Sequence, residues 1–316
     1  MPDLDFNAQL LLYGTLGVLT LASVIGFMLA KTVKGDAGKR TIDNLNARTR
    51  AWWVMAIVFA VALAGQLTGV VVLFALVSFL ALREILTLTP TRRGDHHTLF
   101  WVFFVAVPLQ YYLVRTDWYG LFSVLIPVYG FLFLAIRSAV AGDVTCYLER
   151  AAKIYWAVMI GVYCLSHVPA LMTLNIQGAG KMQWELVAYL AIVVQMSDVL
   201  QYVWGKLLGR HKLAPKVSPS KTWEGLIGGI ASATALGSAL HVITPFNWWQ
   251  AALMSLAICV MGFFGGLVMS AIKRDAGVKD YGHLIEGHGG MMDRVDSLAF
   301  AAPVFFHLTR YYFGVP

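Results

Sequence analysis

The sequence predicts an all-α, polytopic integral membrane protein with about ten transmembrane helices and a polar site that faces the cytoplasm. Of its 316 residues, 59% are hydrophobic and only 13% are charged, and the mean hydropathy is +0.68. Apolar runs long enough to cross a bilayer, about 20 residues each, recur along the whole chain. No stretch has the composition of a water-soluble domain.

The first apolar run, residues 8–30, is expected to be a true membrane helix rather than a cleaved signal peptide. Asp3 and Asp5 precede it and basic residues follow it, which reverses the charge order of a signal peptide, and its apolar core is too long for one. We therefore expect its N-terminus to lie outside the cytoplasm. The basic residues that follow it are Lys31, Lys34, Lys39 and Arg40.

Residues 51–86 form an apolar run that is too long for a single span. The polar segment 66–69 interrupts this run, so we expect two short, closely packed helices here. Single spans are expected in the remaining apolar runs, which completes the set of ten helices: 98–114, 119–135, 154–172, 185–204, 225–243, 249–271 and 296–313.

The basic residues predict how these helices are oriented. With the N-terminus outside, 21 of the 24 Lys and Arg residues fall on the cytoplasmic side, and Arg115, Lys181 and Arg310 are the exceptions. This positive-inside asymmetry predicts that both termini face outward and that loops 205–224 and 272–295 lie in the cytoplasm. The net charge of +7 thus reports orientation, and a nucleic-acid partner is excluded because no basic soluble domain exists.

The densest polar stretch is residues 270–297, which holds nine of the chain's 41 acidic and basic side chains. Its basic residues carry donors and no acceptor, which suits phosphate oxygens. Its aspartates offer the hard oxygen ligands that Mg²⁺ prefers. Asp293 and Asp296 stand three apart at the start of a helix, so both would project from one face of it. The other charged candidates are Lys273, Arg274, Lys279, Asp280 and Arg294.

Glycines separate these charged groups. Gly287, Gly289 and Gly290 flank His288 and lead into the helix that carries Asp293. Glycine lets the backbone come close to a ligand, and the free N–H groups of a helix N-terminus favour anions. The stretch therefore predicts a site for a metal-bridged polyphosphate at a membrane surface.

A second polar stretch spans residues 197–229. Asp198 lies in an otherwise apolar span, where a carboxylate is costly enough to indicate a partner or a function. Downstream, Ser218 followed by proline is typical of a helix N-cap with proline at the first helical position. The residues that would then occupy the first turn of this helix, and form an anion site, are Ser220, Lys221 and Thr222.

Both stretches resemble the phosphatidate cytidylyltransferases, also called CDP-diacylglycerol synthases. The first is similar to the family pattern S-x-x-K-R, four residues, K-D, then a short run to P-x-H-G-G-x-x-D-R-x-D. The second is similar to a run of bacterial members, H-K-L-A-P-x-x-S-P-x-K-T-W-E-G, here at residues 211–225. Glu286 replaces the usual proline, and Gly266 stands where many bacterial members carry a carboxylate. The positions that match the first pattern are Ser270, Lys273, Arg274, Lys279, Asp280, His288, Gly289, Gly290, Asp293, Arg294 and Asp296.

The resemblance implies that the phosphate of phosphatidate attacks the α-phosphorus of CTP, which yields CDP-diacylglycerol and diphosphate. It implies one or two Mg²⁺ ions as cofactor, with phosphatidate, CTP and membrane lipids as partners; a homodimer is a further expectation. Asp293 and Asp296 are the first-choice metal ligands, and Asp198 and Asp280 are further candidates. Catalytic roles are expected for Asp293, Asp296, Lys273, Arg274, His288 and Arg294. Nucleotide contacts are expected from Ser218, Ser220, Lys221, Thr222, Lys279, Gly289 and Gly290.

Two alternatives stay open on the sequence alone. A polyprenol or phytol kinase would use similar charges to move the γ-phosphate of CTP to a hydroxyl, although the long signature argues against it. A transporter would use Asp198 for ion coupling, but it should show polar or broken helices in both halves of the chain. We expect one membrane domain, in which residues 1–175 form a scaffold and lipid-facing part and residues 176–316 carry the catalytic loops.

Overall fold

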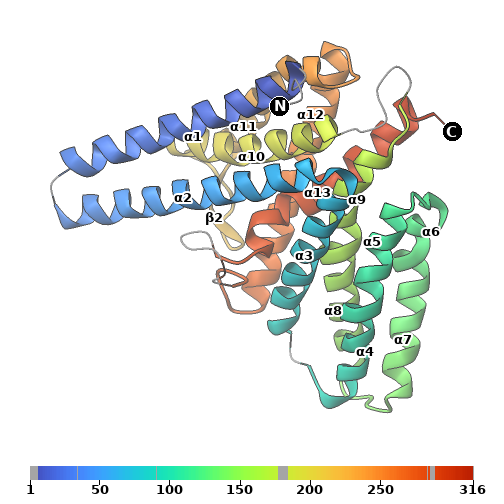
Figure 1. The fold of residues 1–316 in the computed structure, drawn as a ribbon. Helices are drawn as coiled ribbons and strands as arrows, with labels where there is room; N and C mark the ends of the chain where they lie inside the picture. The colour runs from blue at the N-terminus through green and yellow to red at the C-terminus, as the bar shows by residue number, and fades with distance from the viewer. Residues whose placement is uncertain are drawn as a thin grey trace.

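The computed structural model describes residues 6–33, 35–89, 91–176, 184–282, 284 and 289–315. Most of these residues lie in helices, accompanied by two short strands (Figure 1). Within these ranges, nine helical segments are long and apolar enough to cross a membrane. The chain is therefore an all-α integral membrane protein, as the sequence predicted.

The first half of the chain begins with a helical hairpin and continues with spans that contain short π-helical segments. Helices α1 and α2 pack against each other, and α3 follows directly. Each of the next three spans consists of two α-helical pieces joined by a π-helical segment. The bounds are α1 (Phe6–Thr32), α2 (Asp36–Ala64), α3 (Gln66–Thr87), α4 (His96–Trp101), α5 (Val107–Arg115), α6 (Tyr119–Val124), α7 (Phe131–Val140), α8 (Tyr147–Val158) and α9 (Leu165–Ala170).

The second half consists of four long helices and a small hairpin. The bounds are α10 (Trp184–Leu207), β1 (Lys212–Ala214), β2 (Ser218–Thr222), α11 (Trp223–Ala239), α12 (Trp248–Asp275) and α13 (Met292–Phe313). Helix α13 is the tenth span expected from the sequence. It is not among the nine apolar segments, because charged and polar residues at both of its ends lower its hydropathy. It packs against α12, α9, α10 and α3.

The junction between α2 and α3 falls at Gly65, immediately before the predicted break at residues 66–69. The prediction that the two helices would be short was wrong. Helix α2 has 29 residues and α3 has 22. Helix α2 is long because it continues back through the charged segment 36–50, which contains a single glycine and no proline to interrupt it.

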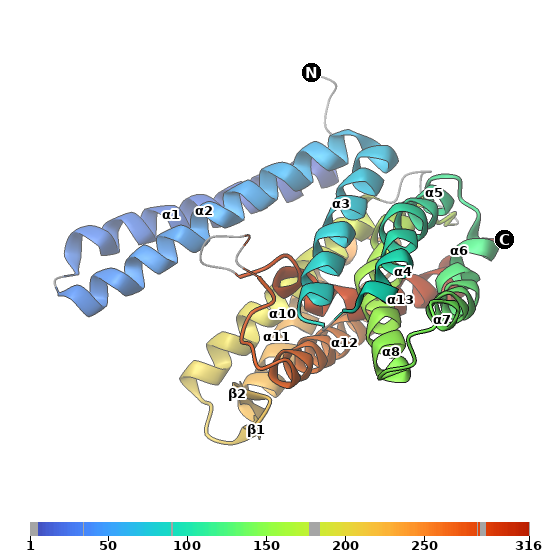
Figure 2. The ribbon, with the colours of Figure 1, turned by 90° about the horizontal axis from the view of Figure 1, so that it is seen from below.

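The hydrophobic core lies where α3, α9, α10, α12 and α13 meet. Its largest fully buried side chains include Tyr189, Phe305 and Leu82. The α1–α2 hairpin contributes little to it: only 6% of the most apolar window of α1 is buried, against 72% for that of residues 147–173. Figures 1 and 2 show this hairpin extending away from the other helices. Its exposed apolar side chains therefore face lipid.

Truncation of a core aromatic residue should distinguish the protein core from the lipid-facing surface. Phe305→Ala opens a cavity beside Tyr189, whose ring centroid is 5.9 Å away, and should lower the free energy of unfolding by about 3 to 5 kcal/mol. Phe104 is 63% exposed, so Phe104→Ala should leave the thermal midpoint nearly unchanged. Unfolding of the detergent-solubilised protein, followed by circular dichroism, measures both, and equal shifts would contradict this description of the core.

Candidate functional site

The two polar stretches of the sequence lie at the same end of the helix bundle. The β1–β2 hairpin follows α10 and contacts α10, α11 and α12. Residues 276–282 follow α12, and Figure 2 shows the coil that leaves α12 and the hairpin on the same side of that helix. The guanidinium Nε of Arg274 donates to the carbonyl of Val217 at 3.4 Å. The end of α12 is thereby attached to the hairpin.

Residues 218–222 form strand β2, so the predicted N-cap at Ser218 was wrong. β2 pairs with β1 in an antiparallel arrangement. The cap of the following helix is Thr222, whose Oγ1 accepts the backbone N–H of Gly225 at 3.1 Å. A serine followed by proline is compatible with extended backbone as well as with a helix start. The strand forms because residues 218–222 pair with β1. A local sequence pattern carries no information about this pairing.

Glu224 closes the base of the hairpin. Its Oε2 accepts the backbone N–H groups of Arg210 at 3.1 Å and of His211 at 3.2 Å. The ring Nδ1 of His211 lies 2.5 Å from its Oε1. Ser220 is exposed on the strand, whereas Lys221 is partly buried. Of the charged residues in β1 and β2, Lys221 is therefore the one that is partly buried against the helices.

Four side chains, Asp198, Lys221, Asp296 and Ser297, form what we call the inner cluster. Lys221 Nζ donates to the carbonyl of Phe263 at 3.3 Å and lies 4.3 Å from the centroid of its ring. Ser297, Asp296 and Lys221 lie close enough to Asp198 to influence its charge. Burial lowers the pKa of Lys221, and the two carboxylates oppose this shift. The cluster thus combines residues of α10, β2 and α13.

Gly266 of α12 borders the inner cluster. A Cβ atom built on Gly266 would lie 3.2 Å from Lys221 Nζ, 3.5 Å from Ser297 Oγ and 3.9 Å from Asp296 Oδ2. Position 266, where the resemblance led us to expect a carboxylate, therefore lies directly beside this cluster. The glycine lets the ammonium group of Lys221 approach the α12 backbone closely.

Asp293 has different surroundings from Asp296. Its Oδ1 accepts Lys273 Nζ at 2.7 Å, and its Oδ2 accepts the backbone N–H groups of Tyr281 at 2.8 Å and of Gly290 at 3.0 Å. The side chain is only 4% exposed. The protein's own donors thus occupy both oxygens, and they tie Tyr281 and Gly290 to α12 and α13. Its role as a metal ligand stays a prediction.

The other predicted site residues are distributed around this core. Arg274 is exposed, and its Nη1 also donates to the carbonyl of Val278 at 2.8 Å. Arg294 is partly buried, and within the described ranges its Nε atom has no hydrogen-bond partner. Gly289 has a φ of 78°, which only glycine adopts readily. Lys279 and Asp280 are exposed, Ser218 is partly buried, and His288 lies outside the described residues.

The described ranges contain no group of three or more His, Cys, Asp and Glu side chains that could hold a metal ion by themselves. The inner cluster brings two carboxylates together, Asp198 and Asp296. Mg²⁺ is commonly held by one or two carboxylates, and water and substrate phosphates complete its octahedron. The donor set therefore fits Mg²⁺ that is shared with a phosphate ligand, rather than a closed protein site.

Glu84 of α3 is a residue of this region that the sequence reasoning missed. Its carboxylate accepts two backbone N–H groups at the start of α13. The signal that could have revealed it is the one that marked Asp198, a carboxylate within an apolar span.

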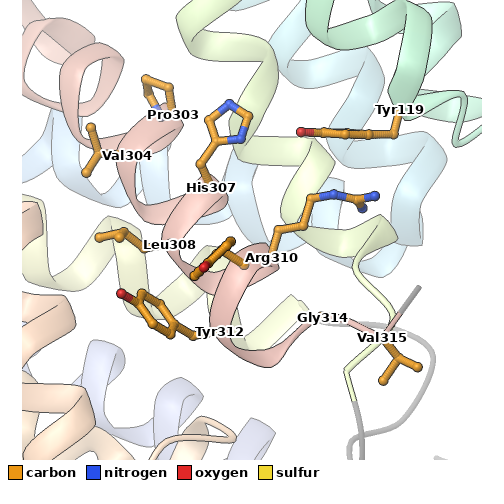
Figure 3. A pocket seen from close by; sticks show the side chains of 10 residues that line it. Tyr119, Pro303, Val304, His307, Leu308, Arg310, Tyr312, Gly314 and Val315 are labelled. Atoms are coloured by element: carbon orange, nitrogen blue, oxygen red, sulfur yellow. The ribbon is translucent and has the colours of Figure 1, made fainter.

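A cavity of about 810 Å³ lies at the opposite end of α13 (Figure 3). Tyr119, His307 and Arg310 line it, together with apolar side chains. Figure 3 shows the guanidinium of Arg310 next to Tyr119, and its carbon lies 3.6 Å from the ring centroid. The α13 residues that line it run from Pro303 to Tyr312, so this cavity lies roughly 15 to 30 Å along the helix from Asp293. It is separate from the candidate site.

Comparison with known proteins gives the family of the chain. The model of the cytidylyltransferase family matches residues 46–312. The chain belongs to this family. It is 41% identical over 299 residues to the uncharacterized protein YnbB of Escherichia coli K12. The aligned region covers 93% of this chain and 95% of that protein. The chain is 32% identical over 212 residues to the phosphatidate cytidylyltransferase of Bacillus subtilis, which covers 66% of this chain and 75% of that enzyme.

A shorter match adds a further relative with the same name. The chain is 39% identical over 120 residues to the phosphatidate cytidylyltransferase of Staphylococcus haemolyticus, which covers 37% of this chain and 46% of that enzyme. The resemblance inferred from the two motifs is thus confirmed. As a member of the cytidylyltransferase family, the protein is an enzyme of the nucleotidyltransferase class.

Removal of Lys273 should destabilise this cytidylyltransferase, because the Asp293 carboxylate would stay buried without its cation. Lys273→Met should lower the free energy of unfolding by roughly 2 to 4 kcal/mol. Lys279 is exposed, so Lys279→Met should change it by less than about 0.5 kcal/mol. Adding Asp293→Asn to Lys273→Met should recover part of the loss. Chemical denaturation in detergent measures all three variants, and similar values for the two lysine variants would argue against the pair.

Proposed function

We propose that this protein is a phosphatidate cytidylyltransferase, which converts CTP and phosphatidate into CDP-diacylglycerol and diphosphate. The observation that carries the proposal is the inner cluster, in which Asp198, Lys221 and Asp296 come together from three elements that carry both motifs. Relatives that are named phosphatidate cytidylyltransferase, such as that of Bacillus subtilis, support the choice of substrates.

The proposed reaction joins two anions. An oxygen of the phosphatidate phosphate forms a bond to the α-phosphorus of CTP, and the bond from that phosphorus to the β-phosphate oxygen breaks, so that diphosphate leaves. Such transfers depend mainly on positioning and on neutralisation of charge. Lys221 and Arg294 supply positive charge at the inner cluster, and Arg274 and Lys279 supply it at the exposed rim. His288 either orients a phosphate or acts as an acid.

Asp198 and Asp296 are the residues that would hold Mg²⁺ in this proposal. When bound, the ion would neutralise charge on the phosphate oxygens and hold the attacking and leaving groups together. Asp280 is exposed, and it would be a further candidate ligand for a second ion. Asp293 instead accepts three protein donors and keeps the loop that carries Gly289 and Gly290 in place.

The protein lies in a membrane, and we propose the inner membrane of a bacterium, with the site on the cytoplasmic side. The bacterial relatives support this assignment, as does the placement of 21 of the 24 Lys and Arg residues. CTP is then available on the side where Lys221, Lys273 and Arg274 lie. Phosphatidate reaches the same residues from the cytoplasmic leaflet.

The direct test is incubation of the purified protein with phosphatidate, Mg²⁺ and CTP labelled at the α-phosphate, followed by lipid extraction. We expect the label in CDP-diacylglycerol. A parallel reaction with CTP labelled at the γ-phosphate should leave the lipid fraction unlabelled. Lipid labelled from the γ-phosphate would instead identify a lipid kinase, and no labelled lipid from either nucleotide would contradict the proposal.

Asp296→Asn should lower turnover by about two orders of magnitude, because a neutral amide binds Mg²⁺ poorly and one lost transition-state contact has roughly this effect. Raised Mg²⁺ or Mn²⁺ should recover part of the activity. Asp275→Asn changes an exposed carboxylate outside the site and should behave like the wild type. Turnover measured across a Mg²⁺ titration decides, and an unchanged metal dependence in Asp296→Asn would remove it from the metal site.

Thiol labelling tests the orientation. In a background from which the three native cysteines, Cys146, Cys164 and Cys259, have been replaced, Lys216→Cys on the hairpin should react with a membrane-impermeant reagent only after lysis of spheroplasts. Thr116→Cys, in the turn between α5 and α6, should react in intact spheroplasts. The opposite pattern would place the site outside the cytoplasm.

A further inference from the structure

Helix α13 begins without a cap of its own. The first N–H groups of a helix have no partner within the helix, and the N-cap residue Met291 contributes no side-chain hydrogen bond. Glu84 of α3 supplies what is missing: its Oε1 accepts the N–H of Met291 at 2.8 Å, and its Oε2 accepts the N–H of Met292 at 2.8 Å. A residue of the first half of the chain therefore caps the helix that carries Asp296.

This arrangement accounts for a carboxylate in an apolar helix. A charge within a membrane span is costly unless it is paired, and Glu84 is partly buried near the end of α3. Two N–H donors and the positive end of the α13 dipole compensate for that cost. Without the N-terminus of α13, Glu84 would have no such partner, so the two elements stabilise each other.

The surrounding loops are shaped to receive this carboxylate. A Cβ atom on Gly282 would lie 2.9 Å from Glu84 Oε1, and a Cβ atom on Gly290 would collide with Oε2. Glycine at both positions allows the carboxylate to approach this closely. Gly290 belongs to the H-G-G part of the motif, and its proximity to Glu84 gives a reason for that glycine which does not involve a ligand.

Two carboxylates hold the start of α13 together. Asp293 accepts the N–H of Gly290, and Glu84 accepts the next two N–H groups, those of Met291 and Met292. Three consecutive backbone N–H groups are thus fixed. The turn that follows carries Arg294 and Asp296 toward the inner cluster.

We propose that Glu84 is a positioning residue of the active site. It acts through the N-terminus of α13, and it sets where Arg294 and Asp296 stand relative to Lys221 and Asp198. The expected effect on turnover rests on the proposed function. The hydrogen bonds by which Glu84 caps α13 do not depend on that function.

The test compares Glu84→Gln with Glu149→Gln, which changes an exposed glutamate paired with Lys153. A glutamine offers one acceptor oxygen in place of two, so one of the two N–H groups loses its partner. Amide exchange at Met291 and Met292, followed by mass spectrometry, should become about tenfold to a hundredfold faster in Glu84→Gln, as expected for loss of one charge-assisted hydrogen bond. It should not change in Glu149→Gln.

Turnover separates positioning from stability alone. Per folded molecule, kcat of Glu84→Gln should fall by about tenfold to a hundredfold, since a small displacement of catalytic groups costs this much, and KM for CTP should change less. Unchanged exchange would overturn the cap, and faster exchange with unchanged kcat would overturn the positioning role. If the wild type made no CDP-diacylglycerol, the proposed function would fail, and the exchange data would still decide whether Glu84 caps α13.

A double variant gives an independent check. Gly290→Ala should lower the thermal midpoint in the wild type, because the new methyl group collides with the Glu84 carboxylate. In a Glu84→Ala background the space is free, so the same substitution should cost clearly less. Equal costs in the two backgrounds would show that Glu84 does not occupy this space.

Discussion

The hydrogen bonds made by backbone N–H groups at the start of α13 are the constraint on which the candidate site depends. A buried backbone N–H without a partner costs several kcal/mol in an apolar environment. Glu84 and Asp293 satisfy three consecutive groups here. Since Asp293 is also paired with Lys273, α3, α12 and α13 are fixed to one another at the point where the motif residues gather.

This constraint separates two aspartates that look equivalent in the sequence. Asp293 and Asp296 lie on one helical face, three residues apart, and that pattern alone predicts a shared metal. In the structure, protein donors surround Asp293, whereas Asp296 lies with Asp198, which is 98 positions earlier, near Lys221. A carboxylate that already accepts an ammonium and two N–H groups has little left to offer a cation. In the proposed site, Asp293 therefore has a structural role, and its neighbour Asp296 is the candidate ligand.

The spans were predictable because the bilayer imposes a length and a composition on each of them, and the motif residues were predictable because their chemistry is dense and local. Strand β2 was not, since its pairing with β1 competes with a helix start that Ser218 and Pro219 signal equally well. Glu84 was not, because its partners Met291 and Met292 lie more than 200 residues further along the chain. The local sequence indicates which polar groups cost free energy when they are buried. It does not indicate which distant group forms the hydrogen bonds that offset this cost.

Gly266 has a consequence for how such a site would bind its ligands. Around the inner cluster, the negative charges of Asp198 and Asp296 are balanced by the positive charges of Lys221 and Arg294. Position 266 is a glycine, so it adds no third carboxylate and no excess of negative charge. A site with balanced charge attracts a free divalent cation less strongly than a site with excess carboxylates. The phosphates of the nucleotide then have to supply the remaining negative oxygens. It follows that, in the proposed reaction, the metal and the nucleotide bind together, and that each raises the affinity of the site for the other.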